Sequence, residues 1–127
     1  MNTQLFTNGL RGAFLVLCLF AANLASAHTG LKESTPAADA TVKEPPAHIN
    51  LVFTAPVRLI KLEVLAGGQA VPTRFAPSSE AVASYVIDTP AMKPGNFTVN
   101  WAAIGADGHT VSNTFSFVVD PAAGSAP

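Results

Sequence analysis

Two parts of this sequence carry side chains with the chemistry of metal ligands. Asp107 and His109 stand on either side of Gly108, and a further histidine, His28, follows directly after the tripeptide Ala25-Ser26-Ala27. In an extended stretch, side chains two residues apart point to the same side of the chain, so the carboxylate and the imidazole can face a common point. The spacing of the first pair therefore indicates a candidate site for a cation.

The first 27 residues have the three parts of a secretory signal peptide. A polar start contains Arg11, an apolar run covers residues 13–22, and Ala25-Ser26-Ala27 fits a small-residue cleavage site. The run is shorter than the about 20 apolar residues that a membrane-spanning helix needs. We therefore expect cleavage after Ala27 and export to the periplasm. Cys18 is the only cysteine and would leave with the leader, which excludes disulfides and thiolate ligands from the mature domain.

Cleavage at this point makes His28 the first residue of the mature chain. Its free α-amine and its imidazole can then close a six-membered ring around one metal ion. Together with His109 and Asp107, the set has three nitrogens and one oxygen, which suits the tetragonal geometry that copper(II) prefers. The metal must displace the proton of the amine, whose ordinary pKa is about 7.7–8.0, so binding should weaken in mild acid.

Each of these residues also has a plain structural interpretation. Asp-Gly is a common hairpin signal. In this interpretation, Asp107 is a turn residue and His109 is its solvated neighbour. Any residue can follow a cleavage site, so the position of His28 alone is not decisive. The third histidine, His48, begins a predicted strand after Pro45-Pro46. We interpret it as a strand-edge residue and not as a ligand.

Alternating apolar and polar residues predict short strands over most of the mature chain, with the period of two that one buried face requires. Predicted strands cover residues 49–54, 59–65, 83–87, 97–101 and 111–119, and turn signals stand at Ala55-Pro56, Gly67-Gly68, 77–79 and 93–95. This spacing predicts an antiparallel β-sandwich or barrel. Trp101 and the phenylalanines on the strands are interpreted as its core, and Tyr85 as a hydrogen-bonding residue at a strand end.

The same pattern divides the chain into three parts. Residues 1–27 are the predicted signal peptide, residues 28–120 form one domain, and residues 121–127 have the composition of a flexible tail. Residues 34–46 are interpreted as a loop. The full sequence has seven Lys or Arg against eight Asp or Glu, without a basic cluster, which argues against nucleic acid or an anionic membrane as a partner. Nothing in the sequence indicates an obligate dimer, so we expect a monomer.

Several phrases of the mature sequence are more specific than the strand pattern. The opening, residues 28–42, places a histidine before a Ser-x-Pro-Ala-x-x-Ala-x-Val phrase, and residues 53–57 read Phe-Thr-Ala-Pro-Val. Residues 94–101, 106–112 and 115–117 complete the pattern. Together these phrases resemble the CopC family of periplasmic copper-binding proteins over essentially the whole mature chain. The resemblance implies an all-β, immunoglobulin-like Greek-key β-sandwich or barrel of about seven short antiparallel strands.

The resemblance also implies a function and a site. It implies a non-enzymatic carrier or buffer in copper homeostasis or resistance, in which His28 and His109 bind one copper(II) ion with Asp107 near or in the coordination sphere. The usual partner is an inner-membrane protein similar to CopD, which we expect on a separate polypeptide.

Two positions depart from the family pattern. Some members bind copper(I) through a methionine-rich segment, but the mature chain has only Met92, so we expect that second site to be absent. Asn113 stands where glycine is common in the family. Because asparagine tolerates left-handed backbone better than most residues, we expect only a small local change there.

Two other functions fit parts of this pattern. An amino-terminal histidine with a second histidine is also the copper-binding arrangement of lytic polysaccharide monooxygenases, so a related copper oxidase is the alternative function. Against it, a carboxylate ligand would fill a position that oxygen needs, and exposed aromatic residues are scarce. The third hypothesis is a structural or adhesion sandwich without a metal.

Overall fold

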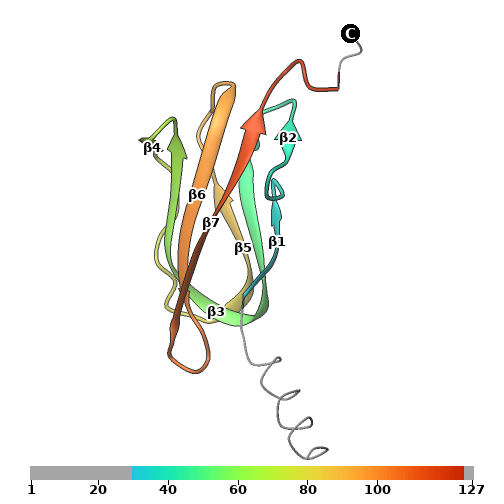
Figure 1. Cartoon of the computed structure of the whole chain (residues 1–127). Coiled ribbons are helices and arrows are strands. Elements are labelled where there is room, and N and C mark those ends of the chain that lie inside the picture. Colours follow the sequence, from blue (N-terminus) through green and yellow to red (C-terminus); the bar gives the residue numbers. More distant parts are fainter. Residues whose placement is uncertain (1–29, 125–127) are drawn as a thin grey trace, which may run out of the picture.

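β-Strands make up the regular structure of residues 30–124, the part of the chain that the computed structural model describes (Figure 1). Seven strands follow in order: β1 (Leu31–Thr35), β2 (Thr41–Val42), β3 (His48–Ala66), β4 (Gln69–Val71), β5 (Val82–Asp88), β6 (Gly95–Ile104) and β7 (Thr110–Val119). Among these residues, no helix is long and apolar enough to cross a membrane. The predicted all-β sandwich is confirmed. The predicted signal peptide, His28 and the end of the predicted tail lie outside the described residues.

The long strand β3 joins the two layers because it belongs to both. Its first half pairs with β1 and β5, and its second half pairs with β4 and β6. The sheet order is β1-β3-β6-β7-β2, with β4 and β5 as further partners of β3. In Figure 1, β3 turns at the lower end of the molecule, so its two halves run up opposite sides of the sandwich.

The bend of β3 corrects one prediction. The sequence predicted a turn at Ala55-Pro56 between two separate strands, whereas the strand continues through both residues. The pairing of β3 with β5 skips from Val52 to Val57. Because proline has no N–H to give to a ladder, a bulge is one of the few places in a sheet that accept it. The backbone therefore bends at Pro56 without leaving the strand.

Tyr85 supplies hydrogen bonds at this irregular point. Its hydroxyl donates to the carbonyl oxygen of Val57 over 2.6 Å and accepts the N–H of Leu59 over 3.1 Å. The carbonyl of Leu59 accepts the N–H of Ser78 over 3.0 Å. The sequence predicted a hydrogen-bonding role for Tyr85 but placed it at a strand end, whereas it lies within β5.

Short strands account for the remaining differences. Residues 34–46, predicted as a loop, contain the end of β1 and all of β2. β2 pairs with β7 in parallel, so the sheet is not wholly antiparallel. β4 was not predicted, although the turn before it was: Gly67 and Gly68 have φ values of +57° and +87°, as a primed hairpin turn requires. Strands of two to five residues are too short to display a clear alternation.

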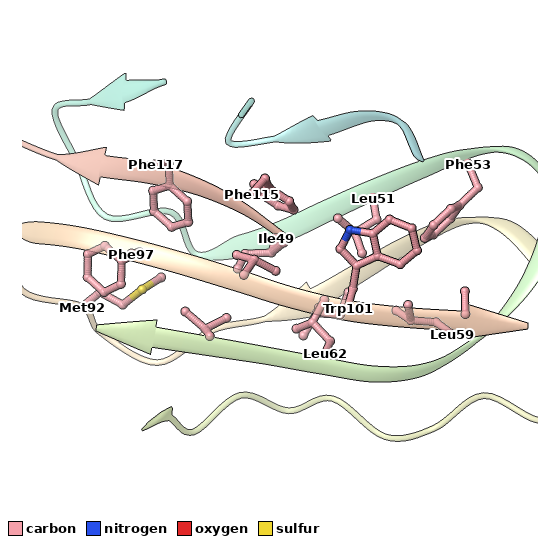
Figure 2. Close-up of a cluster of buried hydrophobic side chains, with 14 of the residues drawn as sticks. Ile49, Leu51, Phe53, Leu59, Leu62, Met92, Phe97, Trp101, Phe115 and Phe117 are labelled. Atoms are coloured by element: carbon pink, nitrogen blue, oxygen red, sulfur yellow. The ribbon is translucent and has the colours of Figure 1, made fainter. Parts of the chain in front are cut away.

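The core lies between the layers and comes from the inward positions of β3, β5, β6 and β7 (Figure 2). Its members include Ile49, Leu51, Phe53, Leu59, Leu62, Phe97, Trp101, Phe115 and Phe117, together with Met92 from the segment between β5 and β6. The rings of Phe53 and Trp101 meet edge to face with centroids 5.2 Å apart, and those of Phe97 and Phe117 stack at 5.3 Å. Each such side chain contributes about 1.5–3 kcal/mol when fully buried. The core prediction is confirmed.

Candidate metal centre

The loop between β6 and β7 presents Asp107 and His109 at one end of the sandwich. Within this loop, residues 105–109, the N–H of Gly108 donates to the carbonyl of Gly105 over 3.0 Å, and the N–H of Gly105 donates to the carbonyl of His109 over 3.0 Å. Gly108 has a φ of +84°, which glycine adopts at little cost. Asp-Gly therefore does form a hairpin turn, and the same turn brings the carboxylate and the imidazole together.

Both carboxylate oxygens of Asp107 are directed at His109. Oδ1 accepts the backbone N–H of His109 over 3.0 Å, and Oδ2 lies 2.9 Å from the ring Nδ1. Because a carboxylate only accepts hydrogen bonds, this contact requires the proton on Nδ1, so the lone pair of the neutral ring is at Nε2. The side chains of Asp107 and His109 are 67% and 84% exposed. An ion in solution can therefore reach Nε2 directly.

The contact shifts the titration of both groups in the directions expected of an ion pair. The hydrogen bond from the His109 ring, followed by that from its backbone, lowers the pKa of Asp107. The same side-chain hydrogen bond, followed by charge attraction to Asp107, raises the pKa of His109. Because both groups are exposed, water screens the pair and its contribution to folding stability is small. The main effect of the contact is to fix the orientation of the His109 ring.

The start of the described chain reaches the same end of the molecule. Gly30 and Leu31 line one pocket together with Val111, which is two residues beyond His109. Figure 1 likewise shows the beginning of β1 and the β6–β7 loop at the lower end of the sandwich. The fold therefore brings Asp107 and His109 together at the end of the sandwich where the described chain begins. The position of His28 itself stays a prediction.

Asp107 and His109 alone do not make up a metal site. Within residues 30–124, no group of three or more His, Cys, Asp or Glu side chains is placed to hold a metal ion. Copper(II) in a tetragonal site uses more donors than one carboxylate and one imidazole. Any copper site at this loop therefore needs donors from elsewhere.

His48 lies away from this loop. It is the first residue of β3, as the sequence predicted, and its Nδ1 lies 2.7 Å from Oδ1 of Asp88. Asp88 is the residue opposite it on β5, so the contact is a cross-strand pair. That His48 is not a ligand stays a prediction.

Thr54 is a residue of this end of the molecule that the sequence analysis missed. Its hydroxyl accepts the N–H of Gly30 over 3.1 Å, and its own N–H donates to the carbonyl of Gly30 over 2.9 Å. The two residues are 24 positions apart, and threonine is common in strands for packing reasons alone. No local signal in the sequence indicates this contact.

These features define a class: a small β-sandwich with an exposed histidine and aspartate pair, suited to metal binding, at one end. The family follows from comparison with known proteins. A family model described as the CopC domain matches residues 31–120, and the chain belongs to this family. No curated protein matches the sequence.

Solved structures agree with this assignment. CopC from Methylosinus trichosporium OB3b superposes with a TM-score of 0.63 at 23% identity, over 73% of this chain and 94% of that one, which supports the fold alone. PcoC, a methionine-rich copper resistance protein from Escherichia coli, gives a TM-score of 0.61 at 28% identity, over 74% of this chain and 100% of its own. The selenomethionine form of PcoC gives a TM-score of 0.60 at 25% identity, over 72% of this chain and 99% of its own.

The family sets the class of function. CopC family proteins are periplasmic copper-binding carriers and not enzymes, so membership supports copper binding and copper resistance over the oxidase alternative. The chain differs from the methionine-rich Escherichia coli protein in having only two methionines. Met92 is 7% exposed and lies in the core.

Proposed function

We propose that this protein is a periplasmic copper(II) carrier that binds one ion per mature chain. The proposed ligands are the α-amine and imidazole of His28 and Nε2 of His109, with Asp107 in or next to the coordination sphere. The carrier then passes its ion to an inner-membrane partner similar to CopD on a separate polypeptide.

The contact of Asp107 with His109 is the observation that carries this proposal. A histidine that ligates a metal commonly donates its other ring N–H to a carboxylate, which sets the tautomer and makes the ring a better donor. The 2.9 Å contact between Oδ2 of Asp107 and Nδ1 of His109 has this arrangement and directs Nε2 outward. In this arrangement Asp107 lies on the side of the ring opposite Nε2, next to the coordination sphere. For Asp107 to become a direct ligand, its contact with Nδ1 must open.

The donor types favour copper(II) as the cargo. Two imidazoles, an amine and a carboxylate are nitrogen and oxygen donors, and copper(II) is the tightest binder of the divalent first-row ions at such sites. Copper(I) selects thioethers and thiolates. Because Met92 is buried among apolar side chains, we propose no copper(I) site.

The exposure of the pair suits a carrier. A partner can approach His109, whose side chain is 84% exposed, without any opening of the fold. Ligand exchange between the two proteins is then possible while the ion is still partly held. This supports transfer to a partner over permanent storage.

A copper titration of the protein with a free and a blocked amino terminus tests the proposal. The full chain is expressed with its leader, the exported protein is purified, and its first residue is identified by mass. Copper(II) binding is measured by competition with a chelator and by electron paramagnetic resonance. The matched variant has one residue inserted between Ala27 and His28, which removes the α-amine of His28 and leaves the described domain unchanged.

The expected result is a tight one-to-one site with a nitrogen-rich tetragonal signal in the exported protein. The inserted residue should weaken this site and change its spectrum. Equal and weak binding in both proteins would show that His28 is incidental and would overturn the proposed site.

A further inference from the structure

Thr54 and Gly30 are joined by two hydrogen bonds just before β1 begins. The N–H of Thr54 donates to the carbonyl of Gly30, and the N–H of Gly30 donates to the hydroxyl of Thr54. In a regular antiparallel pair of this kind, both residues would exchange backbone N–H and carbonyl groups. Here the side-chain oxygen takes the place of one backbone carbonyl. The position of Gly30 therefore depends on a hydroxyl group at residue 54.

The location of this contact relates it to the candidate metal site. Thr54 directly precedes the bend of β3 at Ala55-Pro56, at the end of the sandwich where the β6–β7 loop lies (Figure 1). Gly30 lines the pocket that also contains Val111, which is on β7 two residues beyond His109. The contact thus holds the chain at the end of the sandwich that carries the candidate metal ligands.

Covalent geometry limits how far the amino-terminal donors can be from this anchor. Two peptide units separate Gly30 from His28, and consecutive Cα atoms are 3.80 Å apart, so the two Cα atoms lie within about 7.6 Å of each other. An anchored Gly30 therefore restricts the volume that the amine and imidazole of His28 can occupy. Ordering a residue of the chain costs backbone entropy, so an anchor made before the ion arrives reduces the cost of binding.

We propose that Thr54 is a positioning residue for the copper site: its hydroxyl holds Gly30 so that the amino-terminal chelate meets Asp107 and His109. This inference rests on the proposed function. Thr54 touches no ion in this scheme and acts only through Gly30.

The test compares three variants of the full, exported chain. Thr54→Val keeps the size of the side chain and removes the hydroxyl, whereas Thr54→Ser keeps the hydroxyl. Thr98→Val is the matched control, because the hydroxyl of Thr98 contacts that of Ser116 at 3.3 Å and lies on β6. Copper(II) affinity and the electron paramagnetic resonance spectrum are measured for each. Thermal unfolding without copper checks that each variant is folded, and Thr54→Ala replaces Thr54→Val if the latter is not.

We expect Thr54→Val to bind copper(II) roughly tenfold more weakly, the lower end of the loss that follows when a residue that orients a metal ligand is changed. Its spectrum should change, because the nitrogen donors of His28 are less well placed. Thr54→Ser and Thr98→Val should match the unchanged protein. Affinity and spectrum that stay the same in Thr54→Val, or a loss that Thr54→Ser shares, would overturn the inference.

The blocked amino terminus separates this inference from the proposed function. In the protein with one residue inserted before His28, the Thr54→Val change should have no further effect, because the chelate that Thr54 positions is already lost. If the insertion itself leaves copper binding unchanged, the proposed function fails. If the insertion abolishes tight binding but Thr54→Val does not weaken it, only the role of Thr54 is wrong.

Discussion

The hydroxyl of Tyr85 donates to the carbonyl of Val57 over 2.6 Å at the point where β3 passes from one layer to the other. The same hydroxyl accepts the N–H of Leu59 over 3.1 Å. One side chain on β5 thus satisfies two backbone groups of the bend. The bend sets the end of the sandwich at which Thr54 and Gly30 meet.

Removal of this hydroxyl should destabilise the fold without changing its core. Tyr85→Phe leaves a partly buried carbonyl and N–H without these bonds, which should lower the free energy of unfolding by about 1–3 kcal/mol. Urea unfolding of the copper-free protein measures the difference. The control is Ser84→Ala, at an exposed position of the same strand, which should stay within about 0.5 kcal/mol. An unchanged unfolding midpoint in Tyr85→Phe would show that water replaces both bonds.

Asp107→Asn should lower the pKa of His109 in the copper-free protein. The carboxylate raises this pKa by accepting the ring N–H and by its charge, so a neutral amide removes the main causes of the shift. The ring should therefore lose its proton at a lower pH in the variant. A nuclear magnetic resonance titration of the His109 ring gives the value directly. Asp88→Asn is the matched control, because Asp88 contacts His48 instead. If Asp88→Asn lowered the pKa of His109 as much as Asp107→Asn does, Asp107 would not be the cause of the shift.

Copper(II) should raise the melting temperature, and a chelator should reverse the rise. An ion that binds only the folded state at a hundred times its Kd stabilises it by about 2.7 kcal/mol. The gain here should be smaller, because the amine and imidazole of His28 belong to one residue and still chelate copper in the unfolded chain. Only the donors of the β6–β7 loop require the fold. Thermal unfolding of His109→Ala with and without copper checks this, since that variant should gain almost nothing.

Copper(II) should quench the fluorescence of Trp101, the only tryptophan of the sequence. The residue is 3% exposed and lines the same pocket as Gly30 and Val111. We therefore expect a paramagnetic ion at the β6–β7 loop to be near enough to quench its ring. The signal should fall until one equivalent is bound. In His109→Ala, the same loss should require more copper. Full occupancy by electron paramagnetic resonance with unchanged fluorescence would mean that the ion binds elsewhere.

The strands that could be predicted were those with long alternation. The segments around Ile49, Phe97 and Phe115 each place apolar residues at every second position, and each forms a strand with that face buried. The turn at Asp107-Gly108-His109 could be predicted equally well, because the aspartate, the glycine and the histidine are neighbours in the chain. Local periodicity and local turn chemistry are properties of the sequence itself.

The errors came from contacts between distant segments. Pro56 signalled a turn because proline breaks regular ladders, but Tyr85, from another strand, supplies hydrogen bonds to the residues that follow it and the strand continues. β2 forms only by pairing with β7, and the paired residues Thr41 and Val118 are 77 positions apart. No pattern within two residues can indicate such a partner.

The sequence by itself determined the all-β class, the core residues and the pairing of Asp107 with His109, because each depends on residues close together in the chain. The tertiary structure alone decided that β3 spans both layers and that Thr54 holds Gly30 at the end where the β6–β7 loop lies. The physical reason is that these features are hydrogen bonds between segments that meet only after the chain has folded. Their partners depend on register and bending, which local composition does not specify.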